Sequence, residues 1–422
     1  MSAVIPGAAG PLPSAVAEKR PTPAFLVAYV LAWYGVNLAL NGFAAASIPR
    51  LLIEIDNEGK GEALALVAGV GGIIVMIITP LFGRLSDRTR SRFGMRRPWL
   101  VGGAFVGLAG VFGLAWSTSV AQLVVFWCVV QIGFGATNMA LNALLADQVP
   151  TRIRARVSAA NGTAMVVAVI TGSALVGAIP ESMRAWWFLA PGIAAVALSL
   201  LLARVLRDVV LTEEPAPLSV RAVLGTYWLN PVRYRDFAWA WLCRFLVTMS
   251  ILSISLYMLF FITDSLGVAK EAAPGVQAQA LALFFVGNVA TTILCAWISD
   301  RLGRRKIIVF AACLFTMAGL LTAMAVPTVG GFLIGVAIIG AGQGAFISVD
   351  VALMTEVLPS ADDVGKDLGI VALSYQLPQV LVPVAAVPVL AVGGGDYLAL
   401  YLWAAVLVVL GGLAILPVKG VR

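Results

Sequence analysis

The sequence predicts an all-α membrane protein with twelve transmembrane helices, arranged as two pseudo-symmetric six-helix bundles. Three observations support this prediction: the composition, the recurrence of long apolar runs and a weak internal repeat. Of the 422 residues, 61% are hydrophobic and 12% are charged, which is about half the charged share of a soluble domain. The mean hydropathy is +0.98. This composition excludes an ordinary water-soluble fold and argues against an enzyme or a nucleic-acid-binding protein.

The twelve predicted spans are apolar runs that are long enough to cross a hydrocarbon core of about 30 Å. Gly and Pro, with 42 and 21 residues, interrupt most of these runs, as is usual where membrane helices pack closely or bend. The predicted spans are residues 24–48, 62–82, 98–117, 121–146, 157–179, 186–206, 238–263, 278–298, 307–326, 331–355, 369–391 and 397–417.

Two short sequence matches indicate that the chain is a duplication. GRLSDR at 83–88 matches AWISDR at 296–301, and ADQVP at 146–150 matches TEVLP at 355–359, at similar offsets of 213 and 209. Repeated halves of this kind are typical of secondary transporters, which bind substrate near the membrane midplane. The predicted domains are a disordered cytoplasmic tail (1–22), an N-terminal bundle (23–206), a central cytoplasmic loop (207–237), a C-terminal bundle (238–417) and a short cytoplasmic tail (418–422).

The distribution of basic residues predicts the orientation. If the N-terminus is cytoplasmic, the outer loops hold only Arg50, Lys60, Arg184 and Lys270 of the 28 Lys and Arg residues, and Arg244 falls within a span. The remaining 23 lie on the inner side. Because Lys and Arg concentrate in cytoplasmic loops, we expect a multi-pass protein of the cell (plasma) membrane with both termini cytoplasmic.

The sequence offers no metal ligands and no motif for common catalytic chemistry. The four cysteines lie in apolar runs without a metal-binding spacing, and there is no histidine, which removes the usual ligands of zinc. The chain also lacks a Walker loop, an HExxH pattern and a GxSxG turn. We therefore expect no cofactor, no metal and no enzyme activity, and any proton carrier must be a carboxylate.

The most specific motif is the loop GRLSDRTRSRFGMRRP at 83–98, with a shorter partner SDRLGRRK at 299–306. This pair resembles the loop signature of the major facilitator superfamily. The longer form resembles the branch that holds sucrose transporters and bacterial glycoside transporters, as do ALNALLAD at 140–147 and GKDLGIVALSYQLPQ at 365–379. The resemblance implies a secondary transporter that works by alternating access and takes up a sugar or glycoside with protons.

The loop motif also predicts a cytoplasmic gate. Asp87 lies between two arginines and can form charge-assisted hydrogen bonds across the inner ends of neighbouring helices. The resemblance implies that this aspartate sits near a helix N-terminus of the same half, and that a glycine lets helices pass closely. The alternative is that the arginines serve only membrane orientation. The predicted gate residues are Gly83, Asp87, Arg88, Asp300 and Arg301.

Two carboxylates are candidates for proton coupling. Asp350 lies inside the tenth span, where an ionisable group costs about 2.5–3.5 kcal/mol, and Gln343 lies two helical turns earlier on the same face. The alternative for Asp350 is an ion pair with Arg244 that only fixes helices. Asp147 ends the fourth span and matches the aspartate of the family motif RALLAD; it could instead cap the span at the interface.

Amide and aromatic side chains form stripes that could bind a hydroxyl-rich solute, since amides hydrogen-bond without charge and aromatic faces stack on sugar rings. The alternative is that the amides hold helices together. Sucrose-type members of the family carry an arginine where this chain has Asn142, which puts a sucrose-like substrate in doubt. The predicted substrate-binding residues are Trp33, Asn37, Asn41, Asn138, Asn142, Tyr257, Gln343, Tyr375, Gln376 and Gln379.

Three functions remain open from the sequence. The first is proton-coupled symport of a sugar or glycoside, with protons, a small-molecule substrate and the lipid bilayer as partners and no nucleic acid. The second is a proton-antiport exporter of amphipathic compounds or natural products, and the third a non-transporting sensor or assembly factor on a transporter fold. Coupling to sodium stays open as well. We expect the chain to act as a monomer.

Overall fold

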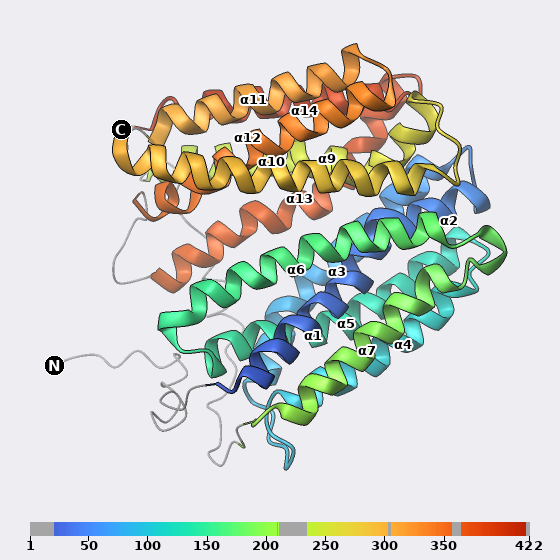
Figure 1. Ribbon diagram of the computed structural model, residues 1–422, viewed down its shortest axis with the longest axis vertical. Coiled ribbons are helices and arrows are strands. Elements are labelled where there is room, and N and C mark those ends of the chain that lie inside the picture. Colours follow the sequence, from blue (N-terminus) through green and yellow to red (C-terminus); the bar gives the residue numbers. More distant parts are fainter. Residues whose placement is uncertain (1–20, 209, 211–233, 303–304, 357–363, 419–422) are drawn as a thin grey trace. The chain divides into compact units, whose positions relative to one another are not determined.

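The computed structural model describes residues 21–208, 210, 234–302, 305–356 and 364–418 of the chain (Figure 1). These residues form helices joined by short connections, with no strand among them. Eleven helices are long and apolar enough to cross a membrane, and a shorter apolar helix follows at Leu398–Ala414. Each of the twelve predicted spans corresponds to one of these helices, so the prediction of an all-α, twelve-helix fold is confirmed.

The first half of the chain contributes seven α-helices and two short irregular ones. They are α1 (Pro23–Gly42), the π-helical turn η1 (Phe43–Ser47), α2 (Ile48–Ile55), α3 (Lys60–Ser86), α4 (Arg97–Ala115), α5 (Val120–Gln148), α6 (Thr151–Ala178), the 3-10 turn η2 (Glu181–Met183) and α7 (Trp186–Val205). The second half contributes α9 (Arg235–Phe260), the π-helical turn η4 (Phe261–Ser265), α10 (Ala273–Leu302), α11 (Arg305–Ala325), α12 (Val329–Glu356), α13 (Val364–Val392) and α14 (Leu398–Ala414).

Local sequence explains several helix boundaries. The Thr22 hydroxyl accepts a hydrogen bond from the backbone N–H of Phe25 (3.3 Å), and Pro23 follows at the first helical position of α1. Ser119 caps α5 in the same way by accepting from the Gln122 N–H. Three prolines lie within α13, and each removes a backbone N–H that would otherwise donate within the helix.

Two π-helical turns interrupt the long apolar runs, and the sequence did not predict them. One, η1, joins α1 to α2, and the other, η4, extends α9. Each follows the first long helix of a predicted half, at the end that faces outwards in the predicted orientation. Because π-helical turns insert one extra residue and often occur at functional sites, these two ends of the fold are candidate functional regions.

The chain divides into two compact units. Unit 1 consists of Met1–Phe43, Ile73–Gly172 and Met183–Ser219, and unit 2 of Ala44–Gly72, Ser173–Ser182 and Val220–Arg422, as far as these ranges are described. Unit 2 therefore contains segments from both halves of the sequence. The division into two bundles around a central loop stays a prediction.

Glycines allow the closest helix contacts inside unit 1. A Cβ atom on Gly103 of α4 would lie 2.6 Å from the carbonyl oxygen of Gly133 and 2.9 Å from the backbone nitrogen of Thr137, both in α5. A Cβ atom on its neighbour Gly102 would meet nothing within 4 Å. Small residues at such contacts are the usual means by which membrane helices approach closely.

Gly103→Ala is therefore expected to lower the thermal unfolding temperature of the purified protein, and Gly102→Ala is not. The added methyl on residue 103 meets backbone atoms that must move, and such overpacking costs about 1–3 kcal/mol. The adjacent Gly102→Ala variant removes a glycine from the same helix without a clash. Equal melting temperatures for the two variants in detergent would contradict the close α4–α5 contact.

Candidate functional site

A buried ion pair joins two helices of unit 2. Nη1 of Arg244 in α9 lies 3.1 Å from Oδ2 of Asp350 in α12, and the two side chains are 8% and 5% exposed. Tyr375 of α13 stacks on the guanidinium, whose central carbon is 4.0 Å from the ring centroid. Three helices thus place a cation, an anion and an aromatic face together.

Several buried polar atoms near this pair and elsewhere in unit 2 have no hydrogen-bond partner among the described residues. They include Nε of Arg244, Oε1 of Gln343 and the hydroxyl of Tyr257. Buried polar atoms of this kind are costly in an apolar environment. They are therefore candidates to bind a polar ligand.

The predicted binding residues of unit 2 do not all meet at the ion pair. Gln343 is seven residues before Asp350 on α12, and Tyr257 is thirteen residues beyond Arg244 on α9, which is about 20 Å along a helix. Tyr257 packs instead near Tyr397, with ring centroids 6.1 Å apart. Gln376 is half-buried and Gln379 is exposed on α13.

Unit 1 carries the other predicted stripes. On α1, the amide of Asn37 donates to the Trp33 carbonyl and the amide of Asn41 donates to Oδ1 of Asn37, both at 2.8 Å. On α5, the amide of Asn142 donates to the Asn138 carbonyl at 2.9 Å. These bonds run along each helix, so they do not join helices.

Two polar atoms of these stripes stay buried without a partner among the described residues: the indole nitrogen of Trp33 and Oδ1 of Asn138. A polar link between helices is made by a residue that the sequence analysis did not single out. The Tyr29 hydroxyl donates to the Leu141 carbonyl (3.0 Å) and accepts from the Asn161 amide (3.1 Å), which joins α1, α5 and α6. Within the stripes themselves, the indole nitrogen of Trp33 and Oδ1 of Asn138 thus keep hydrogen-bonding capacity for a further polar group.

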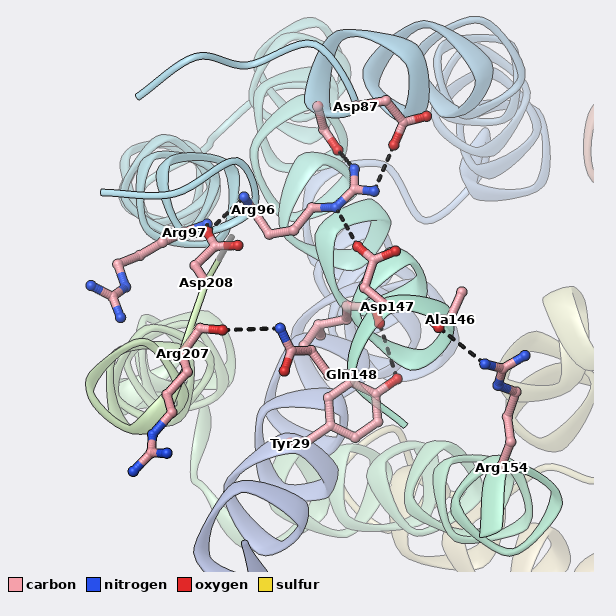
Figure 2. Close-up of polar contacts among 12 residues, drawn as sticks. Tyr29, Asp87, Arg96, Arg97, Ala146, Asp147, Gln148, Arg154, Arg207 and Asp208 are labelled. Atoms are coloured by element: carbon pink, nitrogen blue, oxygen red, sulfur yellow. Dashed lines mark hydrogen bonds and ion pairs between the residues drawn. The ribbon is translucent and has the colours of Figure 1, made fainter. Parts of the chain in front are cut away.

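A charge network occupies the predicted cytoplasmic end of unit 1 (Figure 2). Arg96, at the N-cap of α4, is 4% exposed. Its guanidinium pairs with Asp87 (2.6 Å) after α3 and with Asp147 (2.9 Å) near the end of α5, and it also donates to the Ser86 hydroxyl. A single arginine therefore holds the inner ends of three helices.

Asp208 completes the network, and no sequence pattern singled it out. Its Oδ2 accepts the backbone N–H groups of Arg96 (2.7 Å) and Arg97 (2.6 Å), at the start of α4, where a helix favours negative charge. Gly94 precedes this turn with a φ of 102°, and any Cβ there would overlap Asp208. The helix N-terminus is thus held by Asp208, whereas Asp87 reaches it only through Arg96.

The other predicted gate residues lie outside this network. A Cβ on Gly83 would come 3.1 Å from the terminal methyl of Met139, so this glycine allows close packing of α3 on α5. Arg88 has no ion pair with any described residue. In unit 2, the Arg301 guanidinium stacks on Trp297 at 3.8 Å, and the Asp300 side chain lies outside the described residues.

Known proteins resemble this chain over different lengths. Solute carrier family 45 member 3 from human and from mouse is 38% identical over 53 residues, which is 13% of this chain. The matched stretch spans only 9% of the length of those relatives.

Solved structures match nearly the whole chain at low identity. The nucleoside transporter NupG has a TM-score of 0.74 at 12% identity, over 93% of this chain and 99% of that one. A bacterial homologue of the human lysosomal transporter Spinster has 0.70 at 14%, over 95% and 99%. A D-xylose–proton symporter has 0.66 at 17%, over 94% and 99%. These likenesses show a shared fold.

A family model accounts for the chain more directly. The model described as Major Facilitator Superfamily matches residues 31–278 and 267–420. These two ranges cover all of the described helices except the beginning of α1. The chain belongs to the Major Facilitator Superfamily.

Proposed function

We propose that this protein is a secondary active transporter that moves a small, hydroxyl-rich solute, a sugar or glycoside, together with protons by alternating access. The observation that carries the proposal is the buried Arg244–Asp350 pair with Tyr375 stacked on it. It combines a carboxylate that can take up a proton, a cation that can bind hydroxyl oxygens and an aromatic face that suits a sugar ring.

The pair suggests how protons and solute are linked. Arg244 already has one guanidinium nitrogen without a hydrogen-bond partner in the described structure. Protonation of Asp350 removes its negative charge and releases a further donor of Arg244. A solute with hydroxyl oxygens then satisfies these donors, so its binding favours the protonated carboxyl. Loss of the proton restores the ion pair and weakens solute binding.

The Arg244 guanidinium can also take the place of the arginine that this chain lacks at Asn142. The family resemblance places an arginine at that position for sugar binding, and this chain has an amide there instead. Arg244 supplies a guanidinium from a helix of the second half instead. Two of the three named neighbours among solved structures, a D-xylose–proton symporter and a nucleoside transporter, act on solutes with sugar hydroxyls.

A solute panel in proteoliposomes tests the proposed class. We expect mono- or disaccharides added outside to cause alkalinisation of the outer medium as they enter, because each solute carries protons inwards. The same vesicles without protein provide the baseline. If no sugar moves protons, and amphipathic cations cause acidification outside or compete for binding, the sugar-symport proposal is wrong and the protein is an exporter.

A further inference from the structure

Two of the four cysteines meet between helices of unit 2. Cys243 of α9 is 2% exposed and Cys313 of α11 is 3% exposed, and the two thiols make a hydrogen bond with each other. Each cysteine lies eight positions after the first residue of its helix, which is about 12 Å along the helix. Two sulfurs from different helices therefore share one buried contact.

The helix α14 packs against both cysteines through two consecutive glycines. A Cβ atom on Gly411 would lie 3.3 Å from the carbonyl oxygen of Cys243. A Cβ atom on Gly412 would lie 3.0 Å from the Cβ of Cys313 and 3.5 Å from its sulfur. Larger side chains at these positions would push α14 away from both helices. The two glycines thus allow α9, α11 and α14 to enclose the thiols.

Other uses of the two thiols account for less of this geometry. Among the residues that the structure describes, no group of three or more His, Cys, Asp or Glu side chains could hold a metal ion, whereas structural zinc takes four ligands. A cysteine that serves only as a small packing residue needs no second thiol beside it. The mutual contact of the sulfurs points to the one reaction that requires two thiols, which is disulfide formation.

We propose that Cys243 and Cys313 form a modification site at which a hydroperoxide, such as hydrogen peroxide, joins α9 to α11 by a disulfide. One thiol attacks the O–O bond of the peroxide, becomes a sulfenic acid and releases water. The second thiol attacks the sulfenic sulfur, so that the S–S bond forms and the sulfenic oxygen leaves as a second water. The two sulfurs lose two electrons, and the peroxide gains them.

The surroundings of the pair favour this product. A sulfinate or a metal-bound thiolate would place charge in an apolar interior, which is costly, whereas a disulfide is neutral. Hydrogen peroxide is small and uncharged, so it can reach sulfurs that a charged reagent cannot. Because the second thiol already contacts the first, the closing step is intramolecular. The sulfenic acid is therefore expected to be captured before it is oxidised further.

The disulfide would restrain the turn of α9 that carries Arg244. Successive residues of a helix point about 100° apart, so Cys243 contacts α11 while Arg244 pairs with Asp350 of α12. The bond would hold this turn on α11 and so limit the movement of one partner of the ion pair. The effect on transport rests on the function proposed above, but formation of the bond does not.

Mass spectrometry of oxidised protein tests the proposal. Cys128→Ala with Cys295→Ala removes the two half-buried cysteines and leaves only the pair. The folded protein is treated with hydrogen peroxide in detergent and then denatured with a maleimide. We expect the intact mass to fall by two hydrogen atoms, maleimide labelling to fall from two thiols per chain to none, and a peptide map to contain the Cys243–Cys313 link. Dithiothreitol added after denaturation should restore both thiols.

Two controls identify the cause of any reaction. Cys313→Ser in the same background leaves one thiol of the pair, which should never lose two hydrogen atoms. Protein unfolded in dodecyl sulfate before the peroxide is added should form the link at least about tenfold more slowly, because its thiols are no longer held together. The parent chain with all four cysteines should give the same linked peptide, so the result does not depend on how the replacements affect folding.

Each outcome decides the proposal. The linked peptide in folded protein, with slower formation after unfolding, supports it. Two unmodified thiols, oxygen added to either sulfur in place of the link, or equal rates in folded and unfolded protein would overturn it. No transport is measured, so failure of every sugar in the proteoliposome panel leaves this result intact and the two proposals fail independently.

Discussion

Asp350→Asn is expected to abolish the accumulation of solute driven by a pH gradient while the protein remains folded. Asparagine keeps the shape of the side chain and can hydrogen-bond to Arg244, but it cannot take up and release a proton. Coupled uptake into proteoliposomes with an imposed gradient should fall to the level of protein-free vesicles. Exchange of labelled solute across vesicles without a gradient should stay within about tenfold of the parent, which corresponds to about 1.4 kcal/mol.

The control for this experiment is Glu62→Gln, which removes an exposed carboxylate at the start of α3. It should leave both coupled uptake and exchange unchanged. Full accumulation in Asp350→Asn would show that the coupling proton resides elsewhere, and Asp147→Asn would then be the next variant to measure. Loss of exchange as well as accumulation would assign Asp350 to solute binding rather than to coupling alone.

Arg96→Gln is expected to destabilise the protein by about 3–5 kcal/mol, the usual result of removing one partner of a buried pair. The substitution leaves Asp147, which is 13% exposed, without its cation and removes the contacts of that cation to the ends of α3 and α5. Arg96→Lys should recover only part of the loss, because an ammonium cannot supply three directed N–H bonds in one plane. Thermal unfolding in detergent measures both effects.

A matched substitution in the same loop is Arg92→Gln. Arg92 is exposed, stacks on Phe93 and has no ion pair with any residue that the structure describes, so its loss should not change the melting temperature measurably. Combining Arg96→Gln with Asp147→Asn should recover part of the stability, since no buried charge then remains unpaired. Equal melting temperatures for Arg96→Gln and Arg92→Gln would show that the network contributes only to membrane orientation.

The helices were predictable because each one depends on a local run of apolar residues. A run of apolar residues needs no partner to be recognised, so even Leu398–Ala414 corresponds to a predicted span. The π-helical turns were not predictable, because η1 and η4 consist of residues like those around them. An inserted residue in a helix changes its geometry without changing its hydropathy.

The polar contacts of the site were predictable only in part. The unusual cost of a charge within a span singled out Asp350. Because Arg244 lies well inside another predicted span, its pairing with Asp350 could be stated as an alternative. The Lys60–Asp264 contact joins residues from opposite halves, and both have ordinary positions for loop charges. Asp208 carries no local signal either, because its partners are backbone amides more than a hundred residues away.

The two π-helical turns also have a consequence for the ancestry of the chain. One extra residue rotates everything that follows by about 100° around the helix axis, so η1 sets the direction of Arg50 and η4 that of Asp264. A duplicated gene passes to both copies whatever irregularities its single ancestor possessed. In the duplication that the sequence predicts, one insertion in the single ancestor would account for such a turn after the first long helix of each half.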